Sequence, residues 1–206
     1  PLHYIGEVEP THQGEIPENI FFLTADAFGV LPPISLLTRD QALFYFVLGY
    51  TAKVAGTEDG ILEPQMTFSA CFGAPFMLRH PREYAELLGE YIDRHNINVW
   101  LINTGWAGGP YGVGDRYPIP VTRKIIRRVQ GGLFNDASFE TDPIFGLKIP
   151  AKIDGIESSI LFPNKSWPDQ SVYEEKAEEL AKAFHHKMKD YDDFYTKFQA
   201  AGPILR

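Results

Sequence analysis

The segment from Gly49 to Phe76 constrains the fold of this chain most, because it is long, rich in small and polar residues, and flanked by two helical patterns. Structureless connections longer than about 12 to 15 residues are uncommon in compact domains, and they are usually lids, binding loops or disordered segments. Phe68, Cys71 and Phe72 supply apolar surface for burial, which argues against disorder. We therefore predict that this segment is a functional lid.

The composition predicts a globular chain and argues against several classes of protein. Hydrophobic residues make up 44% of the 206 residues, enough for a sizeable core. No apolar run approaches the roughly 18 residues of a membrane span, and the first ten residues lack a signal-peptide pattern. A net charge of -8 disfavours nucleic acids and anionic membranes as partners, but it permits a nucleotide bound by a few local cations. A single cysteine agrees with the reducing cytosol, so we expect a cytoplasmic location.

The order of apolar patterns predicts an α/β fold. Ile20–Leu23 and Val99–Asn103 have the short apolar runs of buried strands. Thr38 is expected to cap a helix, with Gln41 completing a capping box. A second helix is expected to begin at Pro81 and to end near His95 or Asn96, because Pro81 suits a first turn and apolar residues recur at helical spacing. A strand that follows a helix in this way is typical of an α/β layer.

The second half of the chain continues with helices and irregular segments. Thr122–Val129 is predicted to be helical with Gly131 as its stop, and Asp169–Tyr191 is predicted to be a long amphipathic helix. Leu133–Pro163 is broken by proline and glycine, which favours irregular structure and short strands. No linker, repeat or low-complexity stretch marks a boundary, so we expect a single unit over residues 1–206.

The glycine-rich stretch Gly108–Arg116 follows a predicted strand and precedes a predicted helix, where phosphate-binding loops occur. The spacing from Gly109 to Gly114 fits a P-loop, but Asp115 stands in place of the lysine that grips phosphate. Two interpretations follow. The stretch is a tight surface turn, or it is a nucleotide site in which Arg116 supplies a cation and Thr122 a hydrogen bond.

The other reactive side chains do not indicate a catalytic or metal-binding site. The six histidines form no pair with metal-ligand spacing beside a carboxylate, so no metal site is predicted. His185 and His186 point about 100° apart on a helix and are expected at the surface. Cys71 is expected to be a small buried residue. The basic run from Arg123 to Arg128 is interpreted as a solvated helix face.

Three stretches of the sequence resemble the C-terminal part of the ATP-dependent phosphoenolpyruvate carboxykinases: FLTADAFGVLPP, GYTAKVAGTEDGILEPQMTFSACFGAPF and NTGWAGGPYGVGDR. The shorter stretches PIFGL and ILFPNKSW also fit, so the resemblance runs through nearly the whole chain. It implies part of a C-terminal nucleotide-binding domain with a mixed sheet and flanking helices. The family decarboxylates oxaloacetate with ATP to give phosphoenolpyruvate, carbon dioxide and ADP, and it uses magnesium and manganese.

The resemblance also implies roles for individual residues. Arg116, Tyr117 and Thr122 stand at the positions that hold the base and ribose of ATP in the family. Residues 49–68 correspond to the mobile lid, which excludes water from phosphoryl transfer. The lid residues here include Lys53, Thr57, Glu58 and Asp59. The stretch GTEDG departs from the family's GTERG, and its aspartate changes the local charge by two units beside a triphosphate.

The P-loop, metal-binding and oxaloacetate-binding residues of the family belong to sequence upstream of Pro1, so the resemblance assigns no catalytic residue to this chain. We therefore expect these 206 residues to be inactive alone, because phosphoryl transfer depends on metal and phosphate clamps. The leading interpretation is a C-terminal portion of the enzyme, either truncated or completed by a separate N-terminal chain. The alternative is a noncatalytic nucleotide-binding or interaction protein derived from the family.

Overall fold

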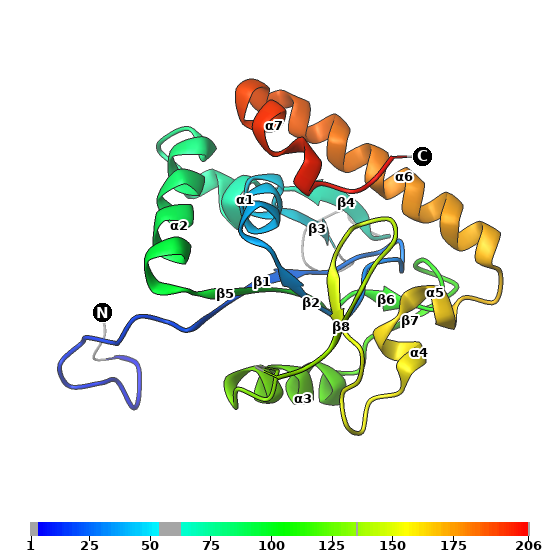
Figure 1. Ribbon diagram of the computed structural model, residues 1–206, viewed down its shortest axis with the longest axis horizontal. Helices are drawn as coiled ribbons and strands as arrows, with labels where there is room; N and C mark the ends of the chain where they lie inside the picture. Colours follow the sequence, from blue (N-terminus) through cyan, green and yellow to red (C-terminus); the bar gives the residue numbers. More distant parts are fainter. Residues whose placement is uncertain (1–3, 54–62, 135, 206) are drawn as a thin grey trace.

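The computed structural model describes residues 4–53, 63–134 and 136–205, and it shows a mixed sheet between two layers of helices (Figure 1). The strand order of the sheet is β1-β5-β2-β9-β8. Its strands are β1 (Asn19–Thr24), β2 (Ile34–Leu37), β5 (Asn98–Asn103), β8 (Phe139–Thr141) and β9 (Lys148–Pro150). β1 and β5 run parallel, whereas the other neighbours are antiparallel. The predicted α/β class with a mixed sheet and flanking helices is confirmed.

Strand β5 lies between β1 and β2 and is buried on both faces, as its apolar run predicts. Val99 and Leu101 belong to one hydrophobic cluster, and Trp100 and Ile102 belong to the other. Successive side chains of a strand point to opposite faces of the sheet. The two clusters are therefore the packing of the two helical layers against opposite faces of one sheet.

The prediction of a buried strand at Ile20–Leu23 is confirmed only in part. Phe22 is buried, but the side chain of Leu23 is 58% exposed. Leu23 is exposed because β1 is an edge strand of the sheet and has fewer neighbouring strands than β5. Strand β2 follows Pro33 directly and was not among the predicted strands.

One helical layer contains α1 (Arg39–Leu48), α2 (Pro81–His95), α6 (Gln170–Met188) and α7 (Asp192–Phe198) (Figure 1). The predicted capping box of α1 is present, since Thr38 Oγ1 accepts from the Gln41 amide and Gln41 Oε1 accepts from the Thr38 amide. The long C-terminal helix is confirmed, with Asp169 as its N-cap. Its buried stripe is Tyr173, Ala177, Leu180, Ala181 and Phe184.

The other layer contains α3 (Ile119–Gln130), α4 (Ser158–Leu161) and α5 (Pro163–Ser166) (Figure 1). Helix α3 begins three residues before the predicted start at Thr122, because Pro120 occupies a first-turn position that proline favours. Ile125 and Val129 pack into the cluster that contains Trp100. Short 3₁₀ helices occur at Ala70–Phe72, Ala74–Phe76, Lys189–Tyr191 and Gln199–Ala201.

The stretch Gly49–Phe76 contains paired strands and 3₁₀ turns in its described parts, so it is not a structureless connection there. β3 (Tyr50–Lys53) pairs antiparallel with β4 (Gln65–Phe68), and two 3₁₀ turns follow. Ladder hydrogen bonds therefore satisfy the backbone at both ends of the predicted lid. We refer to β3 and β4 together as the β3–β4 hairpin.

The expectation that His185 lies at the surface is also wrong. Its ring is 8% exposed, with Nδ1 2.9 Å from the Tyr195 hydroxyl and Nε2 2.7 Å from the Pro203 carbonyl oxygen. The neighbouring His186 is exposed, as expected. Burial of His185 follows from the packing of α7 and the C-terminal segment against α6.

Within the described ranges, no helix is long and apolar enough to cross a bilayer.

Candidate functional site

A pocket of about 440 Å³ lies beside the start of α3 and brings together the three residues predicted to hold a nucleotide. Its lining is Thr104, Arg116, Tyr117, Pro118, Ile119, Thr122 and Arg123. The local sequence explains this grouping. Arg116 ends the short strand β7 (Asp115–Arg116), and Thr122 lies in the first turn of α3, so six residues of chain bring the two side chains to one pocket.

Arg116 is held at the pocket by its contacts with the neighbouring backbone and an indole ring. Nη2 and Nε donate to the Thr104 carbonyl oxygen at 3.0 and 3.2 Å. The guanidinium carbon lies 5.2 Å from the centre of the Trp106 ring, a cation–π contact. Both partners are neutral, so they orient the positive charge and leave it available to an anionic or polar ligand.

The side chain of Tyr117 points into the protein rather than toward the pocket opening. Its hydroxyl donates to the Leu31 carbonyl oxygen at 3.1 Å, and its amide donates to the Gly105 carbonyl oxygen at 2.9 Å. Burial raises the pKa of Tyr117 well above its usual value, so the hydroxyl stays a hydrogen-bond donor. A ligand in the pocket would therefore meet the main chain at this position and not the phenol ring.

The start of α3 adds apolar surface and further polarity to the pocket. The Ile119 side chain is 65% exposed beside Pro118, and these two side chains offer a surface for a flat ring. Thr122 is partly buried, and Arg123 adds a second cation to the lining. The pocket can therefore accept a heterocyclic ring together with hydroxyl or anionic groups.

The glycine-rich stretch forms a tight turn between β6 (Trp106–Ala107) and β7, and this turn ends at Arg116, which the nucleotide interpretation also uses. Gly109 has a φ of 159°, and its carbonyl oxygen would lie 2.1 Å from a Cβ added at Gly29. Glycine is needed at both positions for backbone packing, without any bound phosphate. The stretch is not a P-loop, and what remains of the nucleotide interpretation is the pocket beside α3.

The predicted lid residues are only partly within the described chain. Lys53 ends β3 and is half-buried, opposite Gln65 in the ladder. Thr57, Glu58 and Asp59 lie outside the described residues. The first strand of the hairpin is attached to the end of β1, because the Ala52 amide donates to the Ala25 carbonyl oxygen at 2.9 Å.

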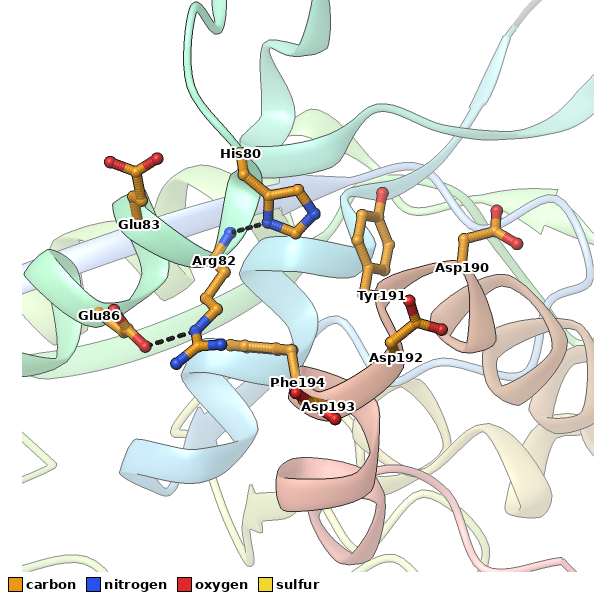
Figure 2. Close-up of a pocket in the computed structure, with 9 residues that line it drawn as sticks. All are labelled: His80, Arg82, Glu83, Glu86, Asp190, Tyr191, Asp192, Asp193 and Phe194. Atoms are coloured by element: carbon orange, nitrogen blue, oxygen red, sulfur yellow. Dashed lines mark hydrogen bonds and ion pairs between the residues drawn. The ribbon is translucent and has the colours of Figure 1, made fainter.

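A second pocket, of about 510 Å³, lies between the start of α2 and the start of α7 and contains none of the predicted site residues. Figure 2 shows its lining, in which Arg82 Nε donates to Glu86 at 2.7 Å. The lining residues are His80, Arg82, Glu83, Glu86, Asp190, Tyr191, Asp192, Asp193 and Phe194. Five carboxylates against one arginine would repel a triphosphate. The pocket beside α3 is therefore the better candidate for a nucleotide.

A buried carboxylate, Asp26, supports the region around the candidate pocket, and sequence reasoning missed it. Its Oδ2 accepts from the Val30 and Leu31 amides at 2.7 and 2.9 Å, and its Oδ1 accepts from the Phe28 amide and the Tyr50 hydroxyl at 2.9 and 2.8 Å. Burial raises the pKa of Asp26, and these hydrogen bonds counter it. The available signal was an aspartate directly after an apolar strand and before a glycine turn.

The family profile described as "Phosphoenolpyruvate carboxykinase" matches residues 1–159 of the chain. The chain belongs to this family. The match extends from the N-terminal segment to α4 and so includes every residue that lines the pocket beside α3. The family resemblance read from the three sequence stretches is confirmed.

Curated members of the carboxykinase family agree with this assignment. Proteins named "Phosphoenolpyruvate carboxykinase (ATP)" from Campylobacter jejuni and Christiangramia forsetii are 51% identical over 207 residues and 50% identical over 194 residues. The aligned regions cover 100% and 94% of this chain. A protein of the same name from Rhizobium etli is 49% identical over 193 residues, which is 94% of this chain. The chain spans 36 to 40% of the length of these relatives.

Proposed function

We propose that this chain provides the base and ribose pocket and the lid of an ATP-dependent phosphoenolpyruvate carboxykinase. Such an enzyme converts oxaloacetate and ATP to phosphoenolpyruvate, carbon dioxide and ADP. The observation that carries the proposal is the convergence of Arg116, the Tyr117 main chain and Thr122 on one pocket. The relatives named as ATP enzymes support adenine nucleotide as the ligand.

Each of these residues has a defined task in the proposed site. The Arg116 guanidinium, oriented by Thr104, attracts the polar and anionic part of the nucleotide. The Thr122 hydroxyl hydrogen-bonds the ribose, and the exposed Ile119 side chain packs against the base.

The lid over residues 49–68 covers the phosphates and excludes water, which would otherwise intercept the reactive species of phosphoryl transfer. Lys53, Thr57, Glu58 and Asp59 are the lid residues in this proposal.

Calorimetric titration of the 206-residue chain with ATP tests the pocket. We expect binding in the millimolar range or tighter, and Arg116→Ala should weaken it by about tenfold, equivalent to about 1.4 kcal/mol. Arg79→Ala is the matched control, because Arg79 is an exposed arginine paired with Glu83 on another element. Absence of measurable binding by the unmodified chain at millimolar ATP would contradict the proposal.

We also propose that these 206 residues do not catalyse the reaction alone. The family implies magnesium and manganese, but the described residues contain no group of three or more His, Cys, Asp or Glu side chains placed to hold a metal ion. Asp115 stands where a P-loop lysine would be. Formation of phosphoenolpyruvate from oxaloacetate, ATP, magnesium and manganese by the purified chain would refute the claim.

The second candidate is a noncatalytic nucleotide-binding protein of the same family, and Asp59 favours it. A carboxylate in a segment that should approach a triphosphate weakens attraction to the phosphates. Carboxykinase activity separates the two candidates. If the chain is part of the enzyme, adding a companion chain that carries a phosphate clamp should restore formation of phosphoenolpyruvate. If it is a noncatalytic protein, the addition should restore no activity.

A further inference from the structure

The buried carboxylate of Asp26 connects the β3–β4 hairpin with the loop that follows β1. The Tyr50 hydroxyl, at the first position of β3, donates to Asp26 Oδ1 at 2.8 Å. On the other oxygen, the Leu31 amide donates to Oδ2 at 2.9 Å. Tyr50 is 3% exposed and Asp26 is fully buried. Hydrogen bonds to a charged group are strong in such a water-excluded setting.

The same loop continues to the pocket beside α3. The Leu31 carbonyl oxygen accepts from the Tyr117 hydroxyl at 3.1 Å, and Tyr117 follows Arg116 directly in the chain. A single residue, Leu31, therefore donates through its amide to Asp26 and accepts through its carbonyl from Tyr117. Movement of the loop around Leu31 would therefore change hydrogen bonds that lead to both the hairpin and the pocket.

Asn103, at the end of β5, supplies a second connection. Its Oδ1 accepts from the Asp26 amide at 2.9 Å and from the Gly105 amide at 2.8 Å, while its Nδ2 donates to the Leu31 carbonyl oxygen at 2.8 Å. Gly105 in turn accepts from the Tyr117 amide. β1 and β5 are parallel, so these contacts join the two loops at the same edge of the sheet, where α/β proteins bind ligands.

We propose that Asp26 is a positioning residue that couples the β3–β4 hairpin to the nucleotide pocket through Tyr50 on one side and Leu31 and Tyr117 on the other. Four donors converge on the two Asp26 oxygens, an arrangement that suits an ionised carboxylate, which only accepts. The inference rests on the proposed nucleotide site. It adds that occupation of the pocket and the placement of the hairpin depend on each other, and such coupling is reciprocal.

Amide hydrogen exchange measured with and without ATP tests the coupling in the unmodified chain. We expect ATP to slow exchange in the pocket segments 104–107 and 115–122, and also in the hairpin strands 50–53 and 65–68. Tyr50→Phe removes one hydrogen bond and leaves three amide donors on Asp26, so the fold should persist. In this variant ATP should still protect the pocket, but the protection of the hairpin should be lost and ATP affinity should fall several-fold.

The matched control is Tyr195→Phe, which removes another tyrosine hydroxyl, 2.9 Å from His185 Nδ1, in the contact between α6 and α7. This control should keep wild-type ATP affinity and hairpin protection, even if it loses stability in urea. ATP binding without hairpin protection in the unmodified chain overturns the coupling and leaves the nucleotide site standing. Wild-type hairpin protection and ATP affinity in Tyr50→Phe would likewise overturn the coupling and leave the nucleotide site standing. No ATP binding by the unmodified chain overturns both proposals.

Discussion

The Arg116 guanidinium donates two hydrogen bonds to one acceptor, the main-chain carbonyl oxygen of Thr104, at 3.0 and 3.2 Å. Thr104 is itself fixed, because its amide donates to the Thr24 carbonyl oxygen at 2.9 Å. The charge at the pocket is thus oriented by backbone that directly follows strand β5. The geometry of the Arg116 guanidinium should therefore contribute to ligand binding as well as its charge.

Arg116→Lys separates geometry from charge. Lysine keeps the positive charge but cannot present two N–H groups in a fixed fork to Thr104 or stack its plane on Trp106. We expect its ATP affinity, measured by calorimetry, to lie between that of the unmodified chain and that of Arg116→Ala. Affinity equal to that of the unmodified chain would mean that charge alone suffices at this position.

Asp142→Asn should change the pH dependence of stability. Burial raises the pKa of Asp142, although the Phe145 and Ile144 amides counter it by donating to Oδ1 at 2.6 and 2.9 Å. A carboxyl group whose pKa is raised on folding stabilises the folded state. This contribution is fully present below the unfolded pKa of about 3.9, and it is lost as pH rises through the folded pKa. Asparagine keeps an acceptor for both amides and carries no charge.

The free energy of unfolding of Asp142→Asn, relative to that of the unmodified chain, should therefore increase between pH 4 and pH 7 in urea titrations, because only the unmodified chain loses stability as this carboxyl ionises. Asp154→Asn, at an exposed carboxylate paired with Lys152, is the matched control for the loss of one carboxylate. A relative stability that falls over this pH range would refute the assignment.

Cys71 should be a poorly reactive thiol in the folded chain. Burial raises the pKa of Cys71 to about 11, and the thiolate is the reactive form. At pH 8 we expect alkylation of the folded chain to be slower than that of the urea-unfolded chain by about a hundredfold. Mass spectrometry follows the modification over time. Equal rates in the two states would show that the thiol is accessible without unfolding.

His185→Leu should destabilise the chain, whereas His186→Leu should not. Leucine at position 185 leaves the Pro203 carbonyl oxygen and the Tyr195 hydroxyl without their buried partner, a loss of about 2 kcal/mol. His186 is exposed, and its replacement should change the free energy of unfolding by less than about 0.5 kcal/mol. Urea denaturation compares the two variants, and similar losses would contradict the assigned role of His185.

Elements that depend on neighbouring residues could be predicted from the sequence. The Thr38 capping box, the Pro81 start of α2 and the apolar stripe of α6 each depend on residues within a few positions of one another. The family stretches also indicated Arg116, Tyr117 and Thr122, whose grouping follows from short spacing across the start of α3.

The directions of these side chains and the contacts that support them depend on how distant segments pack, and they could not be predicted from the sequence. The Tyr117 phenol reaches Leu31, 86 residues away, and Asp26 meets Asn103, 77 residues away. His185 is buried because α7 and the C-terminal segment fold back over α6. Periodicity and composition describe neighbours along the chain, whereas these contacts depend on strand order and helix packing, which bring distant segments together.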